Sequence, residues 1–361
     1  MKINISKKKP KVFVALSGGV DSSVAMLLLL KNGYQVEGVF MKNWSGDDFG
    51  IQTECPWEKD QKDAEEVCKF LGVPFRSFNF EKQYRQSVVD YFFSEYEKGR
   101  TPNPDIMCNK EIKFKLFLDK AIENGADLIA TGHYARIKRV GDKFKLLSGV
   151  DPNKNQVYFL YTLNQEQLSR TLFPIGELTK QEVRKIAFEI GLPNANKPDS
   201  QGICFIGKIN VLEFLLAKIH QKKGLIIDIE TGEVLGEHKG VYFYTIGQGA
   251  KVPGQSEKYF FCKKDLEKNI MYACKGSDNS NLFSKILTTE NIHWIGGIAP
   301  NLDQITGGSI RYRQEPQKIK KIEKYKNGLK VEFLNPQKAI ASGQSLVLFK
   351  NDECLGGGII A

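Results

Sequence analysis

Residues 15–23, Ala-Leu-Ser-Gly-Gly-Val-Asp-Ser-Ser, constrain this chain more than any other segment because they join two different apolar runs. The run before them, residues 12–16, is short and β-branched, which is typical of a buried strand. The run after them, residues 24–30, is rich in Leu, Ala and Met, which is typical of a helix. Glycines permit positive φ and close backbone approach, and free N–H groups at a helix start attract phosphate. The segment therefore predicts a phosphate-binding strand–loop–helix unit.

The loop lacks the Lys-Ser/Thr ending of GxxxxGK[ST], so it is not a phosphate loop of the kinase type. Its Ser-Gly-Gly-Val-Asp-Ser sequence resembles the PP-loop, SGGxDS, of enzymes that convert ATP to AMP by adenylating a substrate. In those enzymes the loop holds the pyrophosphate end of ATP. The competing interpretation is a Gly-Ser turn in which Asp21 caps the helix.

A length of 361 residues predicts two or three domains. Strand and helix patterns alternate over the first part of the chain, with strands expected at 35–41, 73–78 and 127–131 and helices at 58–71, 81–98, 110–124 and 180–190. Such alternation predicts an α/β domain whose parallel sheet carries helices on both faces. Ligands bind such sheets at the carboxyl ends of the strands, where the 17–23 loop and the 131–133 turn both fall.

Short strands with turn signals replace this alternation after about residue 208. A helix is expected at 210–219, and from about residue 281 the pattern is all-β, with Asn327-Gly328 as a hairpin signal. A small antiparallel barrel is the expected form. We therefore expect an α/β domain at 1–208, a central domain at 209–280 and a C-terminal β-barrel at 281–361.

The net charge of +10 suits a polyanionic partner, because Lys and Arg neutralise phosphates, although a modest basic excess is also a common solubility feature. Seven cysteines without a Cys-x-x-Cys pair favour neither a disulfide framework nor a structural zinc site. We therefore expect a reducing cytoplasm. No apolar run approaches the ~18 residues of a membrane span, so no membrane partner is expected.

Two cysteines lie in segments with other reactive residues. Cys108 lies in the proline-bearing segment 103–109, just before Lys110 and the next expected helix. A thiol near a helix N-terminus and a cation tends to ionise, and Asp105 could transfer a proton. Cys204 lies in a second loop-like segment. Each cysteine alone is compatible with a structural role, whereas two loop cysteines in an ATP domain favour sulfur transfer.

Four segments together resemble the tRNA-specific 2-thiouridylase family: SGGVDSS, NPDIMCNKEIKF, ATGHYA and DSQGICFIG. The later segments GEHKGVYFYTIGQ and RYRQ are also similar to that family, and the resemblance runs from about residue 11 to the C-terminus. The PP-loop is shared by many adenylating enzymes. The second and fourth segments, which contain Cys108 and Cys204, are far more specific.

The resemblance implies that ATP adenylates the C2 carbonyl oxygen of the wobble uridine of a tRNA, with Mg²⁺ shielding the triphosphate. Cys204 is expected to receive sulfane sulfur from a persulfide donor protein. Cys108 is expected either to attack that persulfide or to bond to the base, and both routes leave a Cys108–Cys204 disulfide. Asp105 is expected to act as acid or base. The expected substrates are the tRNAs for Lys, Glu and Gln.

The family's other functional positions carry over residue by residue. ATP contacts are expected at Ala15, Leu16, Ser17, Gly18, Gly19, Val20, Asp21, Ser22, Met41 and Gly132. tRNA contacts are expected at Asn103, Pro104, Asp105, Lys154, Asn155, Gln156, Arg311 and Tyr312. Arg and Tyr suit phosphates and stacked bases. The structural alternatives are a core methionine at 41, a tight turn at 132 and a solvated strand face at 311–312.

Two other functions compete with this interpretation. Another PP-loop adenylating enzyme, such as a different tRNA thiolase or an amidating synthetase, would share the loop, but amidation needs an ammonia source and no sulfur relay. A non-catalytic tRNA-binding or sulfur-carrier protein would need neither an intact loop nor both cysteines. ATP turnover with tRNA separates these possibilities.

Overall fold

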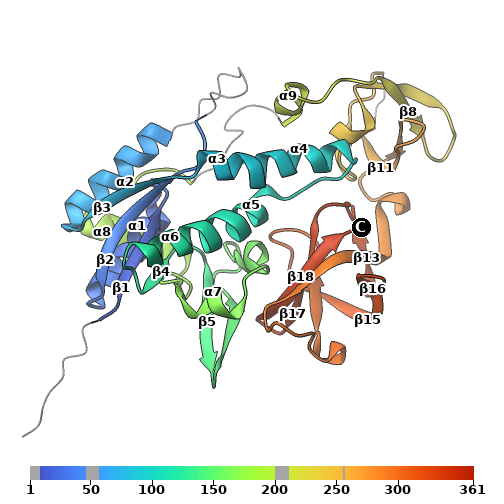
Figure 1. Ribbon diagram of the computed structural model, residues 1–361. Helices are drawn as coiled ribbons and strands as arrows, with labels where there is room; N and C mark the ends of the chain where they lie inside the picture. Colours follow the sequence, from blue (N-terminus) through green and yellow to red (C-terminus); the bar gives the residue numbers. More distant parts are fainter. Residues whose placement is uncertain (1–8, 46–56, 200–210, 255–256) are drawn as a thin grey trace, which may run out of the picture.

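The computed structural model describes residues 9–45, 57–199, 211–254 and 257–361 (Figure 1). These residues form an α/β unit with a parallel sheet, a small central sheet and a closed antiparallel barrel. The predicted fold class is therefore confirmed. Among the described residues, no helix has the length and apolar character needed to cross a membrane.

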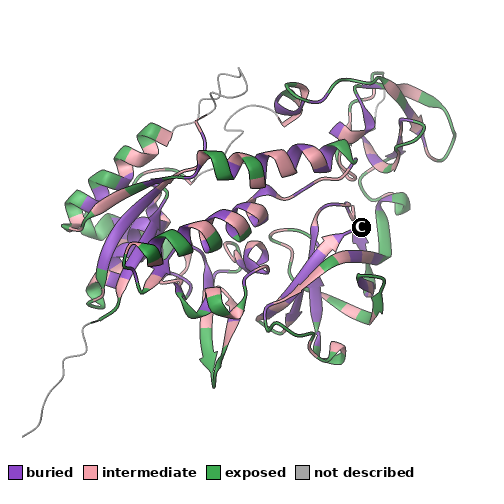
Figure 2. Ribbon diagram, in the orientation of Figure 1, coloured by how far each residue is buried: buried purple, intermediate pink, exposed green. Residues whose placement is uncertain are grey.

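The α/β unit is built on a fully parallel five-stranded sheet. In spatial order the strands are β3 (Phe75–Asn79), β2 (Gln35–Lys42), β1 (Lys11–Leu16), β4 (Leu128–Ala130) and β7 (Thr171–Leu172). Successive side chains of a strand point to opposite faces. In β1, Val12 and Val14 therefore join one buried cluster, whereas Phe13 and Ala15 join another. Figure 2 shows that the middle of this sheet is buried on both sides.

Helices cover both faces of the sheet, as the strand–helix alternation predicts. One face carries α1 (Val20–Lys31), α2 (Trp57–Leu71) and α8 (Lys180–Ile190). The other carries two long helical stretches that contain π-helical turns: α3 (Glu81–Tyr84), η2 (Arg85–Val89) and α4 (Asp90–Glu97), then α5 (Pro104–Met107), η3 (Cys108–Leu116) and α6 (Phe117–Glu123). The short elements η4 (Val157–Leu160) and α7 (Gln165–Ser169) precede β7.

The central unit has its own small core and a five-stranded sheet. Its elements are α9 (Val211–Leu216), β8 (Gly224–Asp228), β9 (Val234–His238), η5 (Val241–Phe243), β10 (Gly249–Ala250), β11 (Tyr259–Asp265) and β12 (Ile270–Lys275). Phe214 of α9 stacks on Phe93 of α4 with ring centroids 5.2 Å apart. Aromatic stacking therefore docks the start of this unit on the α/β unit.

The C-terminal barrel has six strands in the order β13-β16-β15-β14-β17-β18, and it closes because β13 also pairs with β18. The elements are η6 (Ser280–Leu282), β13 (Phe283–Trp294), η7 (Leu302–Gln304), β14 (Gly307–Ser309), β15 (Gln317–Tyr325), β16 (Gly328–Lys338), β17 (Ser345–Lys350) and β18 (Glu353–Ile360). Closure removes unpaired strand edges. The predicted hairpin at Asn327-Gly328 is confirmed, because β15 and β16 flank it.

A hairpin from the α/β unit extends the sheet of the barrel. It consists of β5 (Ala135–Val140) and β6 (Lys143–Ser148), and β6 pairs with β18 at Leu147–Glu353 and Leu146–Cys354. The sequence analysis did not predict this hairpin. Each strand has six residues and only two alternating apolar positions, Ala135 and Ile137 in β5 and Phe144 and Leu146 in β6, so the strand signal is short. It fixes the barrel to the unit that carries the phosphate loop.

The turn between α4 and α5, residues 99–102, contacts both other units. From the central unit, the Lys264 ammonium donates to the carbonyl of Gly99 at 2.7 Å, and the hydroxyls of Thr101 and Thr245 lie 2.9 Å apart. Burial lowers the pKa of Lys264 to about 8. The central unit therefore holds the chain immediately before the Asn103–Cys108 segment.

The barrel holds the same turn from the other side. The Thr101 N–H donates to the carbonyl of Ser342 at 2.8 Å, and the Gln344 side chain donates to the carbonyl of Thr101 at 2.7 Å. Arg100 forms an ion pair with Glu290 of β13 and lies 3.5 Å from the buried Glu95. All three units therefore meet at residues 99–102.

We expect Arg100→Met to lower the free energy of unfolding by about 2 kcal/mol, because it leaves Glu95 buried with one cationic partner fewer. Glu95 keeps Lys98 at 2.9 Å, which limits the loss. Urea unfolding measures the change. The control is Arg139→Met, whose side chain is largely exposed and should change stability by less than ~0.5 kcal/mol. Equal effects of the two variants would contradict this assignment.

Candidate active site

The expected phosphate loop joins the carboxyl end of β1 to the start of α1. The residues expected to contact ATP follow one another through this junction: Ala15, Leu16, Ser17, Gly18, Gly19, Val20, Asp21 and Ser22. Gly18 has a φ of +71°, and a Cβ there would lie 2.4 Å from the backbone oxygen of Asp60 in α2. Both the conformation and the close approach require glycine at this position.

Side-chain hydrogen bonds fix the carbonyl groups of the loop. The hydroxyls of Ser22 and Ser23 donate to the carbonyl of Gly19 at 3.1 and 3.0 Å, and the Asn194 amide donates to the carbonyl of Gly18 at 2.9 Å. Gly19 is the N-cap of α1, and no described side chain caps the first turn. The N–H groups of that turn remain available, which is the usual basis of an anion site at a helix start.

Gly132 follows β4 in a turn that packs directly on the start of α1. A Cβ at Gly132 would lie 2.6 Å from the backbone nitrogen of Ser22 and 2.8 Å from the carbonyl carbon of Asp21. Two residues further on, the Tyr134 hydroxyl donates to Asp21 Oδ1 at 2.9 Å. The structure thus brings the 131–134 turn against the phosphate loop, whereas contact of Gly132 with ATP stays a prediction.

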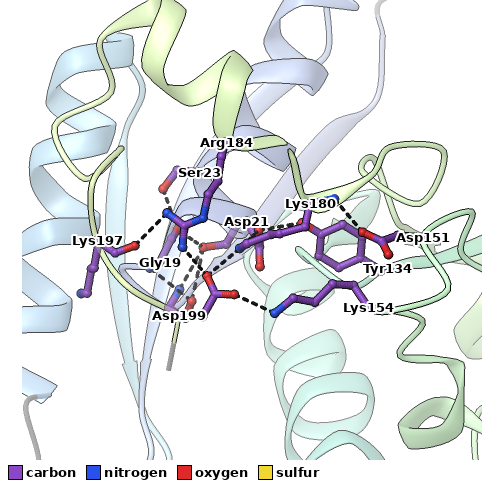
Figure 3. Close-up of polar contacts among 12 residues, drawn as sticks. Gly19, Asp21, Ser23, Tyr134, Asp151, Lys154, Lys180, Arg184, Lys197 and Asp199 are labelled. Carbon is purple, nitrogen blue, oxygen red and sulfur yellow. Dashed lines mark hydrogen bonds and ion pairs between the residues drawn. The ribbon is translucent and has the colours of Figure 1, made fainter. Parts of the chain in front are cut away.

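Three cationic side chains gather beside the loop around the carboxylate of Asp199 (Figure 3). Lys154, Lys180 and Arg184 reach it at 2.7, 2.8 and 2.6 Å. Lys180 also reaches Asp21 at 2.6 Å, so one ammonium joins the phosphate loop to Asp199. Partial burial opposes ionisation of Asp199, but Lys154 and Lys180 outweigh it and hold the pKa of that carboxyl well below its usual range.

The Asn103–Cys108 segment begins a helix, which differs from the expected loop. Asn103 is the N-cap of α5, and its side chain accepts from the N–H groups of Asp105 and Ile106 at 3.2 and 3.3 Å. The helical stretch continues through Cys108 to α6, so the expected helix at 110–124 starts earlier than the sequence indicated. The reason is local: Asn caps the helix and Pro104 occupies its first position, where proline needs no N–H partner.

Asp105 and Cys108 lie one turn apart on this stretch, at the i and i+3 positions that share a helix face. Cys108 is buried and belongs to the same cluster as Ala15 of β1, so it lies on the face of the sheet opposite α1. A different face of the stretch, with Asn103, Met107 and Lys110, lines a cavity of about 460 Å³ beside the barrel. Burial raises the pKa of the Asp105 carboxyl, and the positive charge of Lys113 partly offsets this.

Comparison with known proteins gives the same assignment along the whole chain. Residues 10–208 match the tRNA methyl transferase HUP domain, 212–275 the tRNA methyl transferase PRC-barrel domain, and 284–360 the aminomethyltransferase beta-barrel domain. A protein of Nitrosomonas eutropha named tRNA-specific 2-thiouridylase MnmA is 46% identical over 98% of both chains. The chain belongs to the tRNA-specific 2-thiouridylase family. Relatives of the same name from Alkaliphilus oremlandii and Geobacillus kaustophilus are 47% and 49% identical, each over 98% of this chain and 97% and 96% of their own.

The loop expected to contact tRNA lies beside the phosphate loop in this family member. The Gln156 side chain accepts from the backbone N–H of Tyr134 at 3.1 Å, and Asn155 accepts from the Val157 N–H at 3.2 Å. Lys154 is bound to Asp199. These residues therefore hold the phosphate-loop side of the site together, and their contact with tRNA stays a prediction.

Arg311 and Tyr312 lie in the barrel between β14 and β15. The Tyr312 ring lies 4.5 Å from that of Phe159, in the α/β unit, so part of its surface is used in the junction of the two units. Arg311 is exposed and donates to the carbonyl of Lys338 at 3.3 Å. The pair is therefore on the surface at the edge of the junction, and its tRNA contact remains a prediction.

The structure places Met41 in β2 next to the phosphate loop, because Phe40 pairs with Leu16 at the end of β1. Met41 is partly buried against the core, which fits both a pocket wall and a core methionine. The second expected cysteine, Cys204, lies outside the described residues. Its distance from Cys108 therefore stays a prediction.

Sequence reasoning missed Lys180, Arg184 and the role of Asp199. One signal was available for Lys180: it is the first residue of α8, where the helix dipole disfavours a cation. Arg184 follows one turn later on the same side. A pair of basic residues in the first turns of a helix indicates that another anion stabilises them, and here that anion is Asp199.

Gly132→Ala should weaken ATP binding at least about tenfold, because the new methyl group meets backbone atoms of Asp21 and Ser22 that cannot yield without moving the loop. Calorimetric titration with ATP measures the dissociation constant. Gly249→Ala is the matched control, since a Cβ there meets nothing within 4 Å. Unchanged ATP affinity in a folded Gly132→Ala protein would show that ATP binding does not require the close contact of the 131–134 turn with the start of α1.

Asp105→Asn should stabilise the protein at pH 7. Burial raises the pKa of Asp105 in the folded chain, so stability is lost as pH rises from the unfolded pKa, about 4, through the folded one. Asn avoids this loss, and the advantage should vanish below about pH 4, where Asp is neutral in both states. Thermal melting across pH measures the difference. Asp119→Asn, exposed on α6, controls for the lost charge, and an equal gain there would contradict the burial argument.

Proposed function

We propose that this protein is an ATP-dependent tRNA 2-thiouridylase that replaces the C2 oxygen of the wobble uridine with sulfur. One observation carries the proposal: relatives of that name match the chain end to end. The structure supports it by placing a glycine-rich anion loop and the Asp105–Cys108 helix against the same sheet. The expected substrates are the tRNAs for Lys, Glu and Gln.

In the first step the C2 carbonyl oxygen attacks the α-phosphorus of ATP and pyrophosphate leaves. The start of α1 binds the phosphates, and Lys180 adds positive charge beside them. No cluster of three metal-ligating side chains occurs in the described part of the chain. This fits Mg²⁺, which is usually bound by one or two carboxylates together with substrate phosphates, and Asp21 is the carboxylate that would hold it. When bound, Mg²⁺ shields the phosphate charge.

In the second step sulfur replaces the adenylated oxygen and AMP leaves. We propose that Cys204 carries sulfane sulfur received from a persulfide donor protein. Cys108 either attacks the inner sulfur of that persulfide, which forms the Cys108–Cys204 disulfide and releases sulfide that displaces AMP from C2, or bonds first to C2 and displaces AMP. In the second route the outer persulfide sulfur then attacks C2 and frees Cys108, whose thiolate attacks Cys204 Sγ and leaves the sulfur on the base. Both routes end in the disulfide, and a thiol reductant reopens it. Asp105, half-buried with a raised pKa, suits a group that accepts or donates a proton near the base.

We propose that tRNA spans all three units, which we assign as domains 1–208, 209–280 and 281–361. Asn103, Pro104 and Asp105 would hold the target base, residues 154–156 the tRNA beside the ATP site, and Arg311 and Tyr312 a phosphate and a base from the barrel. The odd cysteine number and lack of a disulfide framework favour a reducing cytoplasm as the site of the reaction.

The decisive test is mass spectrometry of tRNA nucleosides after incubation with ATP, Mg²⁺ and sulfide. Formation of 2-thiouridine, AMP and pyrophosphate supports the proposal. A methylated nucleoside would instead support the methyl transfer named in the description of the matching HUP domain. AMP formation without sulfur incorporation would favour a different adenylating enzyme, and tRNA binding without ATP turnover would favour a carrier protein.

Cys108→Ser should lower turnover with a persulfide donor by about three orders of magnitude while Cys204 still accepts sulfur. Cys204→Ser should lose the persulfide-dependent reaction to a similar extent yet keep activity with free sulfide. Cys262→Ser, a half-buried cysteine of the central unit, is the control and should keep full activity. Thiol mapping after one turnover without reductant should find the Cys108–Cys204 disulfide. Both thiols reduced, with one thiolated tRNA per enzyme, would rule the relay out.

A further inference from the structure

Three cations of this chain surround a single carboxylate beside the phosphate loop. Lys154 comes from the loop after β6, Lys180 from the first residue of α8 and Arg184 from its second turn, and all three contact Asp199 (Figure 3). The side chain of Lys180 is only 12% exposed. Holding three cations together costs free energy through mutual repulsion unless an anion lies between them. Asp199 is that anion in the structure.

The position of the cluster identifies a larger anion that would fit it. Lys180 binds Asp21 of the phosphate loop with the same ammonium that binds Asp199. Asp199 is therefore separated from the loop by one side chain. An anion that bound both the start of α1 and these cations would carry several charges and span two neighbouring groups. A diphosphate group has this form, and Lys and Arg are the side chains that bind phosphate most strongly.

We propose that Lys180 and Arg184 form a binding site for the pyrophosphate group of ATP and that Asp199 occupies it as an internal anion before nucleotide binds, whereas Lys154, the third partner of Asp199, stays assigned to the tRNA. The proposal rests on the proposed function, since it assigns the pyrophosphate of that reaction to named side chains. Asp199 then competes with ATP for these cations, and the affinity for pyrophosphate depends on the charge of Asp199.

The residues just before Asp199 stay anchored when Asp199 leaves the cluster. Two residues earlier, the Lys197 ammonium is held by the carboxylates of Asp60 and Asp63 of α2. Asp21 keeps the Tyr134 hydroxyl as a partner when Lys180 turns to a phosphate. About a quarter of the Asp199 side chain is exposed, so water can receive its charge. Displacement therefore leaves no unpaired buried carboxylate, and Lys197 stays anchored on α2.

The test is calorimetric titration of the full chain with inorganic pyrophosphate, without tRNA. Asp199→Asn removes the competing charge and should tighten pyrophosphate binding about tenfold, whereas Asp199→Glu keeps the charge and should stay within about threefold of the wild type. Glu37→Gln is the matched control, because Glu37 is also held by two cations, Lys11 and Arg76, and its loss changes the net charge equally. It should leave the affinity unchanged.

A second pair of variants tests the cations themselves. In the Asp199→Asn background, Arg184→Gln should weaken pyrophosphate binding about tenfold. Arg184 has no Asp199 carboxylate to bind in that background, so its replacement removes only a ligand of the phosphate. If Asp199→Asn is unfolded at the assay temperature, Asp199→Ser replaces it with the same expectation. Pyrophosphate affinity that is equal or weaker without the Asp199 charge would overturn the proposal.

The two proposals fail in different ways. If the wild type makes 2-thiouridine but Asp199→Asn does not tighten pyrophosphate binding, the internal-anion proposal alone is wrong. If Asp199→Asn tightens binding as expected but no thiolated tRNA forms, the anion site stands and the proposed reaction is wrong. Tightening by Glu37→Gln to the same degree would show a general charge effect and would also overturn the internal-anion proposal.

Discussion

The phosphate loop depends on backbone segments that approach each other more closely than any side chain would permit. A Cβ at Gly18 would lie 2.4 Å from the backbone of α2, and a Cβ at Gly132 would lie 2.6 Å from the backbone of α1. Three elements that are distant in sequence therefore meet at the carboxyl edge of the sheet. This contact orients the start of α1, and the available N–H groups there, toward the place where Tyr134, Lys180 and Asp199 gather. The rest of the site is built around that edge.

The same edge explains how the two chemical halves of the site are separated. Alternate residues of β1 pack on opposite faces of the sheet, so α1 with its anion site lies on one face and the Cys108 helix on the other. A substrate that reaches over the end of the sheet can meet both. The phosphate side is rich in cations, whereas Cys108 is buried among apolar side chains. The proposed phosphate binding and thiol chemistry would thus take place in environments of different polarity.

The fold class could be predicted from the sequence because its helical patterns are long and its hairpin turn carries the Asn-Gly signal. The α1, α2 and α8 helices and the β15–β16 hairpin lie where the patterns predict them, and the all-β pattern from about residue 281 corresponds to the barrel. The predicted start of the Cys108 helix was wrong. The proline-bearing segment was expected to be a loop, whereas Pro104 is the first helical residue after the Asn103 cap. The pairing of the β5–β6 hairpin with the barrel and the Asp199 cluster were missed because they depend on partners far away in sequence, Cys354 and Lys154.

Residues 99–102 give the arrangement of the three units a chemical consequence. The central unit holds this turn through Lys264 and the barrel holds it through Gln344, and the turn leads directly into the Asn103 cap of the Cys108 helix. A shift of either unit relative to the α/β unit would therefore pull on the backbone that positions Asp105 and Cys108. The contacts of Lys264 and Gln344 are to the carbonyl groups of Gly99 and Thr101, whereas Arg100 and the Thr101 hydroxyl add side-chain contacts from the turn to Glu290 and Thr245. The positions of the two β units and the geometry of the Cys108 helix are therefore linked through residues 99–102.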